Sequence, residues 1–128
     1  MKILILYDFP LWGNGSSTWI RNTVEEFVRM NHKIGIVAPE ERRFMEDKIR
    51  QYPAKPPQTP VYIGNPELPG AKRYSELSAR EITEVYKAFI DTTLDAVANF
   101  EPDLIHAHHL SLISLVARYI YALKGIKT

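Results

Sequence analysis

The sequence predicts an α/β protein with a parallel sheet, and two patterns carry that prediction. Short apolar runs rich in β-branched residues, such as residues 3–7 and 34–38, suit strands buried on both faces. Between such runs lie segments with apolar residues three or four positions apart, which is the spacing of an amphipathic helix. Strands that alternate with helices form a parallel sheet with right-handed crossovers. The 128 residues, 45% of them hydrophobic, are enough for one domain.

The first part of the chain supplies two strands and one helix. Residues 3–7 form the first expected strand, and a loop with turn-forming residues follows it. One of the hydroxyl residues 16–18 is expected to cap a helix, whose apolar stripe ends near residue 28. The second strand spans residues 34–38 and stops before Pro39.

The middle of the chain is less regular. Residues 40–52 are charged but carry apolar residues on one side, so a short surface helix is predicted there. Residues 53–70 contain six prolines, which exclude a regular helix, although residues 61–63 suit a short strand.

The last part of the chain returns to helices and a strand. Ser78 and Glu81 match a capping box that begins the longest helix, which ends near Asn99. Residues 103–107 form the last expected strand, and an apolar helix over residues 110–123 follows. The order of elements is therefore β-α-β-α-(β)-α-β-α.

Composition excludes several classes of function. The net charge is only +1, so no nucleic-acid partner is expected. The chain has no cysteine, which excludes a disulfide framework, a cysteine-based zinc site and a thiol nucleophile. Neither a signal-peptide pattern nor an apolar run of about 20 residues is present, so we expect a cytoplasmic protein.

The loop after the first strand is the first candidate site. Ligands of open α/β sheets bind beyond the carboxyl ends of the strands. Gly13 and Gly15 allow close approach of a phosphate, and the helix start at Ser16 attracts an anion. A flexible connection with two turn glycines is the alternative. NAD and ATP motifs are not matched, since Thr18 stands where a third glycine is needed and no Gly-Lys-Ser/Thr follows.

Three histidines at the end of the last strand are the second candidate site. Alternation places His106 and His108 on one side of the strand and His109 at its exit. His106 is expected to be a hydrogen-bonded core residue, whereas His108 and His109 are predicted substrate contacts at the carboxyl edge. No metal site is predicted, since no nearby carboxylate completes a ligand set. No residue is assigned a catalytic role.

Several aromatic and basic residues are secondary candidates. Trp19 lies on the first helix and is predicted to be core, whereas Trp12 suits a loop anchor or a sugar-stacking surface. Arg42 and Arg43 belong to a basic, partly apolar segment. A solvated helix face is expected there, and a weak contact with a membrane surface is the alternative.

Four segments occur in a characteristic order: KILILYDFP with the loop GNGS, then RMNHKIGIVAP, EPDLIHAHH and LKGI. Together they resemble the amino-terminal half of the family-4 retaining glycosyltransferases of the GT-B fold. The resemblance covers most of the chain except residues 53–70. Asn14, inserted between the two glycines, departs from the usual glycine pair of that family.

The resemblance implies a Rossmann-like, doubly wound parallel sheet in which residues 1–128 form an incomplete, acceptor-side half. The carboxyl-terminal nucleotide-sugar domain is absent from the chain. The implied reaction transfers a hexosyl group from a nucleotide-sugar, which is a substrate and not a cofactor, to a sugar, lipid or small-molecule acceptor. Gly13, Gly15 and Ser16 would lie under the donor, and His108 and His109 would line the cleft.

Two further expectations follow from this half-built sheet. The chain alone is expected to be inactive, and its open sheet edge is expected to promote self-association. A stand-alone flavodoxin-like or Rossmann-like module with a binding or regulatory role is the alternative. Binding of flavin against binding of a nucleotide-sugar discriminates between the two.

Overall fold

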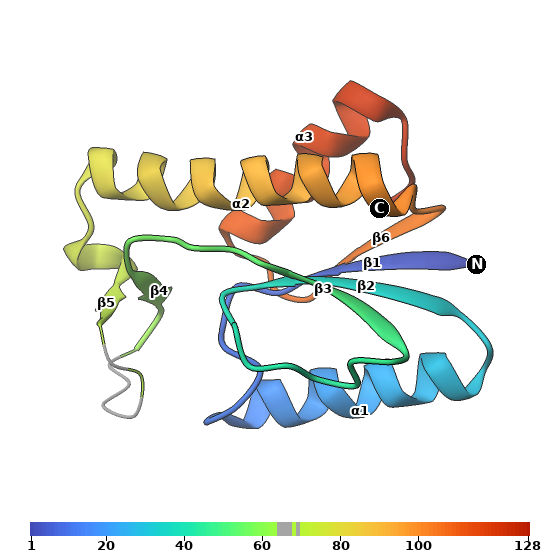
Figure 1. Cartoon of the computed structure of the whole chain (residues 1–128). Coiled ribbons are helices and arrows are strands. Elements are labelled where there is room, and N and C mark those ends of the chain that lie inside the picture. Colours follow the sequence, from blue (N-terminus) through green and yellow to red (C-terminus); the bar gives the residue numbers. More distant parts are fainter. Residues whose placement is uncertain (64–67, 69) are drawn as a thin grey trace.

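The computed structural model describes residues 1–63, 68 and 70–128 and confirms an α/β fold with a parallel sheet (Figure 1). The main sheet contains four strands: β1 (Lys2–Leu6), β2 (Lys33–Ala38), β3 (Ile49–Pro53) and β6 (Leu104–Ala107). Their order is β3-β2-β1-β6, and every neighbouring pair is parallel. The long helices are α1 (Gly15–Arg29), α2 (Ala79–Phe100) and α3 (Leu112–Lys124). This arrangement is Rossmann-like.

Helices cover both faces of the sheet, with α1 on one face and α2 and α3 on the other (Figure 1). Successive residues of β1 point to opposite faces of the sheet, so they pack into two separate apolar layers. Ile5 is buried on the side of α1 with Ile20, whereas Leu4 is buried on the opposite side with Phe89. Burying each such side chain stabilises the fold by about 1.5–3 kcal/mol. Packing of these two apolar layers fixes the positions of the strands and helices. It therefore determines which loops lie next to each other at each end of the sheet.

The start of α1 corrects the sequence prediction. Asn14, and not one of residues 16–18, is the N-cap. Its Oδ1 accepts a hydrogen bond from the backbone N–H of Ser17 at 2.7 Å, and the Ser17 hydroxyl lies 3.3 Å from the backbone nitrogen of Asn14. Gly13 has a φ of 90°, a backbone region that favours glycine. Asn14, which stands between the two glycines of the loop, is thus the residue that caps the helix.

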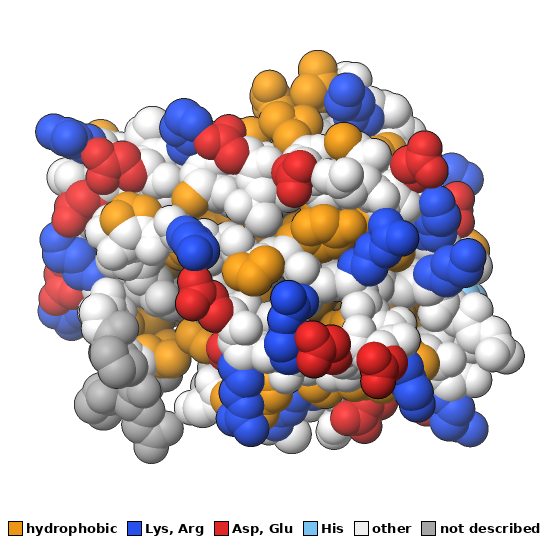
Figure 2. Space-filling model, viewed as in Figure 1, with side chains coloured by type: hydrophobic (Ala, Val, Ile, Leu, Met, Phe, Trp, Pro, Cys, Tyr) orange, Lys and Arg blue, Asp and Glu red, His pale blue; other side chains and the backbone are white. Residues whose placement is uncertain are grey.

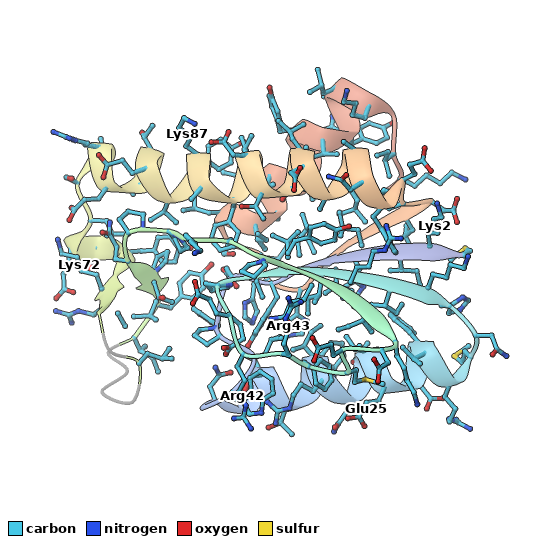
Figure 3. The ribbon with its side chains drawn as sticks, viewed as in Figure 1. Lys2, Glu25, Arg42, Arg43, Lys72 and Lys87 are labelled. Atoms are coloured by element: carbon cyan, nitrogen blue, oxygen red, sulfur yellow. The ribbon has the colours of Figure 1, made fainter. Side chains whose placement is uncertain are left out.

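The predicted helix over residues 40–52 is wrong, because the end of that segment forms β3 beside β2. The side-chain amide of Gln51 organises the loop that replaces the helix. Its Nε2 donates to the carbonyl oxygens of Glu40 (2.8 Å) and Arg42 (3.0 Å), and its Oε1 accepts from the N–H of Phe44 at 3.2 Å. Phe44 is buried in the layer of α1. Arg42 and Arg43 lie on this loop above α1 (Figure 3).

The proline-rich segment forms a small separate sheet. Strands β4 (Thr59–Val61) and β5 (Ala71–Arg73) pair in parallel, and the short 3-10 helix η1 (Tyr74–Glu76) follows. The predicted strand at 61–63 therefore lies two residues earlier in the chain. No regular helix occurs in the described part of residues 53–70, as the prolines predicted. Residues 64–67 and 69 of that segment lie outside the described residues.

The last two long helices and the last strand agree with the predictions made from the sequence. Ser78 and Glu81 form the capping box of α2, with 2.8 Å between the backbone N–H of Ser78 and a carboxylate oxygen of Glu81. Gly125 ends α3 with a φ of 71°. Beyond it, the carbonyl oxygen of Lys127 accepts a hydrogen bond from the N–H of Ile105 at 2.8 Å. The backbone at Lys127 thus begins to pair in parallel with the outer edge of β6.

The surface is mixed in charge and carries an apolar stretch over α3. On the face shown in Figure 2, basic and acidic side chains are interspersed. The apolar atoms at the top of that view lie over α3, where Leu115, Tyr119 and Leu123 are exposed. None of the helices in the described residues is long and apolar enough to span a membrane.

Candidate functional site

The strand order points to one end of the sheet. From β1 the chain proceeds outward to β2 and β3 and later returns to β6 on the other side of β1. The loops that leave the carboxyl ends of β1 and β6 therefore diverge, and this is where open α/β sheets bind ligands. Both groups of sequence-predicted residues, the glycine loop and the histidines, leave the sheet at this edge.

Tyr7, the residue after β1, joins the two groups. Its hydroxyl donates to Oδ1 of Asn14 at 3.1 Å and lies 2.7 Å from the hydroxyl oxygen of Ser16. Its ring lies 5.4 Å, between centroids, from the rings of both His108 and His109. Burial raises the pKa of Tyr7 to about 12, although the Ser16 hydroxyl lowers it, so this phenol stays protonated and pins the glycine loop to the sheet.

The glycines themselves face open space. A Cβ atom added at Gly13 or Gly15 would meet no other atom within 4 Å. Ser16, by contrast, is engaged: its hydroxyl donates to Oδ1 of Asn14 at 2.8 Å. The backbone of the loop is therefore open to a ligand, while the hydroxyl of Ser16 serves the internal network that holds the loop in place.

A buried carboxylate holds His109. Asp8 is only 2% exposed, and its Oδ1 accepts a hydrogen bond from Nδ1 of His109 at 2.5 Å. Its Oδ2 accepts from the hydroxyl of Ser111, which is also the N-cap of α3. With its proton on Nδ1, the imidazole presents Nε2 as a hydrogen-bond acceptor. Nε2 has no hydrogen-bond partner among the described residues, and the His109 side chain is 21% exposed.

Sequence reasoning did not select Asp8 or Ser111. The available signal for Asp8 was an acidic residue placed directly after a buried strand, at the edge where ligands bind. Its partner His109 lies 101 positions later, so the contact depends on the position of β6 beside β1 and on no local pattern.

His108 lies in a stack of aromatic rings. Its imidazole is 4.6 Å from the ring of Trp19, with 20° between the planes, and 6.3 Å from the nearly parallel ring of His106. Burial, together with the neighbouring imidazoles of His109 and His106, lowers the pKa of His108 to about 4. His108 is therefore neutral at pH 7 and acts as a polar, uncharged ring.

His106 and Trp19 differ from their predictions. His106 is partly exposed and not core, and it lines a cavity of about 370 Å³ beside β6. Burial lowers its pKa too. Trp19 was predicted to be core but is 51% exposed. Ile20 carries the buried stripe of α1, and a neighbouring helix position points about 100° away from it.

Trp12 has the contacts of the predicted loop anchor. The guanidinium of Arg42 lies 4.4 Å from the centre of its ring, and the ring of Phe44 packs edge-on at 6.0 Å. The loop after β1 is thereby attached to the loop between β2 and β3.

The middle segment of the chain packs against the same edge. The hydroxyl of Tyr62 donates to the carbonyl oxygen of Leu110 at 2.8 Å, and the ring of Tyr62 lies 5.0 Å from that of Tyr74. Burial, together with the negative charge of Asp8, raises the pKa of Tyr74 to about 12. Tyr62 and Tyr74 therefore pack together beside the loop that follows β6.

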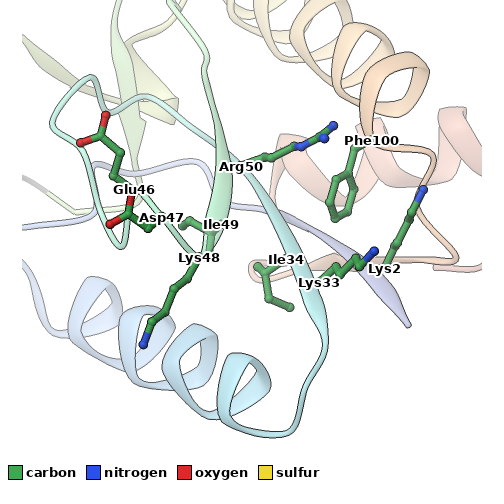
Figure 4. Close-up of a pocket in the computed structure, with 9 residues that line it drawn as sticks. All are labelled: Lys2, Lys33, Ile34, Glu46, Asp47, Lys48, Ile49, Arg50 and Phe100. Carbon is green, nitrogen blue, oxygen red and sulfur yellow. The ribbon is translucent and has the colours of Figure 1, made fainter.

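A larger cavity, of about 490 Å³, lies at the opposite edge of the sheet (Figure 4). Four cationic side chains line it: Lys2, Lys33, Lys48 and Arg50. Arg50 donates to the carbonyl oxygen of Asn99 at 2.9 Å, and Lys2 pairs with Glu101 at 3.4 Å. Cations at the carboxyl end of α2 are stabilised by the negative end of the helix dipole. The positions of Arg50 and Lys2 are thus explained without a ligand.

Metal binding and relatedness give no further assignment. No group of three or more His, Asp or Glu side chains in the described part of the chain is arranged to hold a metal ion. The chain matches no protein-family model and no curated protein. A function is therefore proposed from the geometry at the carboxyl edge and from the order of the motifs.

Proposed function

We propose that residues 1–128 form the acceptor-side domain of a nucleotide-sugar-dependent retaining glycosyltransferase, which transfers a hexosyl group to a sugar, lipid or small-molecule acceptor. The supporting observation is the meeting of the open glycine loop with His108 and His109 at the edge where the strand order reverses. Such an edge suits a donor whose phosphates approach a helix start while its sugar reaches the neighbouring strand end.

The residues divide the work in this proposal. The backbone around Gly13 and Gly15 receives the donor phosphates, and the N–H groups at the start of α1 favour their negative charge. Nε2 of His109 accepts a hydrogen bond from a substrate hydroxyl. Asp8 is a positioning residue that fixes the imidazole and stabilises the positive charge if His109 takes up that proton.

The proposal requires a second domain. A GT-B transferase closes two Rossmann-like domains over its substrates, and the one described here supplies a single open wall. The pairing of Lys127 with β6 supports an extension of this sheet beyond four strands. Without that extension, the edge of β6 offers unpaired backbone groups, and we propose that the 128-residue chain is inactive and self-associates there.

The experiment is to read the coding sequence beyond the Thr128 codon and to express the whole reading frame. The expected product contains a second α/β domain and transfers hexose from a nucleotide-sugar such as UDP-glucose or GDP-mannose. A stop codon directly after the Thr128 codon, or a complete protein that binds no nucleotide-sugar, would overturn the proposal.

A flavodoxin-like binding module is the second candidate. It is favoured by the combination of a capped helix start, the hydroxyl residues 16–18 and an exposed Trp19 beside them. A flavin needs a phosphate site of this kind and an aromatic surface for its ring system. Titration of the chain with FMN distinguishes the candidates, because a flavoprotein quenches flavin fluorescence on binding and the proposed transferase domain does not.

A further inference from the structure

Trp19 forms a flat apolar surface that the fold holds in place. One face of its indole is covered by the imidazole of His108, and 51% of the residue stays exposed. A Cβ atom added at Gly15, one turn before Trp19, would meet no other atom within 4 Å, so the indole does not cover this turn and the space above it is open.

Other aromatic rings support the Trp19 surface on the side that faces the protein. His108 is itself backed by the nearly parallel ring of His106 and by the buried ring of Tyr7. A large aromatic side chain that is pre-positioned by other rings loses little conformational entropy when a ligand binds to it. An exposed tryptophan without such support would be weaker evidence for a binding site, since single exposed apolar residues are common.

The residues near the indole on α1 are polar. Thr18 precedes it and Asn22 lies one turn further along α1, and both are exposed. Arg21, the nearest basic residue in the sequence, donates to the carbonyl oxygen of Leu11 and to the hydroxyl of Thr18, and it lies over the ring of Trp12. The site therefore offers hydroxyl, amide and imidazole groups around a flat apolar centre.

We infer that Trp19 and His108 form a stacking platform for the pyranose ring of an uncharged hexoside. A pyranose presents C–H groups on one face and hydroxyls around its rim, which matches an indole face with polar neighbours. The nearest cation in the sequence, Arg21, is already hydrogen-bonded to Leu11 and Thr18, so a phosphate on the indole would have to displace these contacts, whereas an uncharged ring would not. The inference rests on the proposed function for its biological role, since it names the acceptor as a neutral hexopyranoside.

The test follows the indole N–H signals of the 15N-labelled chain during titration with methyl α-glucopyranoside, methyl α-mannopyranoside and maltose. We expect the Trp19 signal to shift with at least one of them, with Kd in the millimolar range. Variants of Trp19 lack this indole, so their Kd is taken from the backbone amide signals of residues 15–22 in the same spectra. Trp19→Leu keeps the apolar character but removes the flat face, and it should weaken binding about tenfold. Trp19→Phe should bind within about threefold of the unaltered chain.

Two controls make the result specific. Trp12→Phe changes a tryptophan that packs under Arg42 on the adjoining loop, and it should leave Kd unchanged. UMP tests the competing ligand class. The inference is overturned if no glycoside shifts the Trp19 signal, if Trp19→Leu binds as tightly as the unaltered chain, or if UMP shifts that signal more than every glycoside.

The outcomes also separate this inference from the proposed function. If the complete reading frame encodes no transferase but a glycoside binds on Trp19, the platform stands and the transferase proposal fails. If the complete protein transfers hexose while no glycoside reaches Trp19, the transferase proposal stands and the platform fails.

Discussion

Replacing Asp8 by asparagine changes the centre of the candidate site while keeping the volume of the side chain. In the structure the carboxylate is almost fully buried and accepts two hydrogen bonds, from Nδ1 of His109 and from the hydroxyl of Ser111. The substituted amide has one acceptor oxygen and one donor NH₂ group. Its oxygen can therefore accept from one of the two partners, and its NH₂ group faces the other, which must then act as an acceptor.

The size of the effect follows from the two bonds. A hydrogen bond to a charged group contributes about 1.5–3 kcal/mol, and a neutral one contributes about 0.5–1.5 kcal/mol. Weakening both bonds by about 1 kcal/mol each predicts a loss of about 2 kcal/mol in the free energy of unfolding. For a domain of this size, that loss lowers Tm by about 6–10 °C.

The same substitution should move a proton on His109. A carboxylate partner accepts from Nδ1–H, whereas an amide that turns its NH₂ group toward His109 requires a lone pair on Nδ1 and the proton on Nε2. The nitrogen that faces the substrate then changes from an acceptor to a donor. Imidazole 15N chemical shifts distinguish the two tautomers directly.

The assay combines urea unfolding, followed by tryptophan fluorescence, with these 15N spectra of Asp8→Asn. Ser111→Ala is the matched control, since it removes one partner of Asp8 and leaves the carboxylate bound to His109. We expect it to lower stability but to keep the tautomer. The reasoning is refuted if Asp8→Asn changes the unfolding free energy by less than about 0.5 kcal/mol and leaves the proton on Nδ1.

Three further predictions concern the loops and the pH dependence. Because the folded pKa of His108, about 4, lies below its usual 6.5, the unfolded chain takes up that proton first, and the free energy of unfolding falls as pH drops from about 6.5 to about 4. Urea titrations across this range should give a shallower fall for His108→Gln, and coincident curves would contradict the assignment. Gly13→Ala should lower the unfolding free energy by about 1–2 kcal/mol, because Gly13 has a φ of 90°. Gly15→Ala should leave the unfolding free energy unchanged or raise it by up to about 1 kcal/mol. Equal effects of the two substitutions in urea unfolding would be inconsistent with the loop geometry. Gln51→Ala should cost about 1–2 kcal/mol and speed amide hydrogen exchange at Phe44, and unaltered exchange there would argue against the amide-held loop.

Local patterns explain what the sequence could predict. Strands β1, β2 and β6 are short apolar runs with clear limits, and Ser78 with Glu81 marks the start of α2 within one turn. These signals depend on only a few neighbouring residues, so they can be recognised in the sequence without knowledge of the fold. The place of the candidate site at the carboxyl edge followed from them, since it needs only parallel strands.

Contacts between distant residues explain what the sequence could not predict. The segment that ends in β3 was predicted to be helical, because the amide of Gln51, which holds its loop, acts across eleven residues. The bond from His109 to Asp8 depends on β6 lying next to β1. Trp19 borders the apolar stripe of α1, and its exposure depends on how the helix is rotated over the sheet.

The most direct test of the central claim is the rate of hexosyl transfer by the protein expressed from the complete reading frame, measured for His109→Gln and Lys33→Gln. His109 lies at the proposed site, whereas Lys33 lines the larger cavity at the opposite edge of the sheet. We predict transfer from a nucleotide-sugar, a fall in kcat/KM of about 100-fold for His109→Gln and no change for Lys33→Gln. An absence of transfer, or an equal effect of the two substitutions, would contradict the claim.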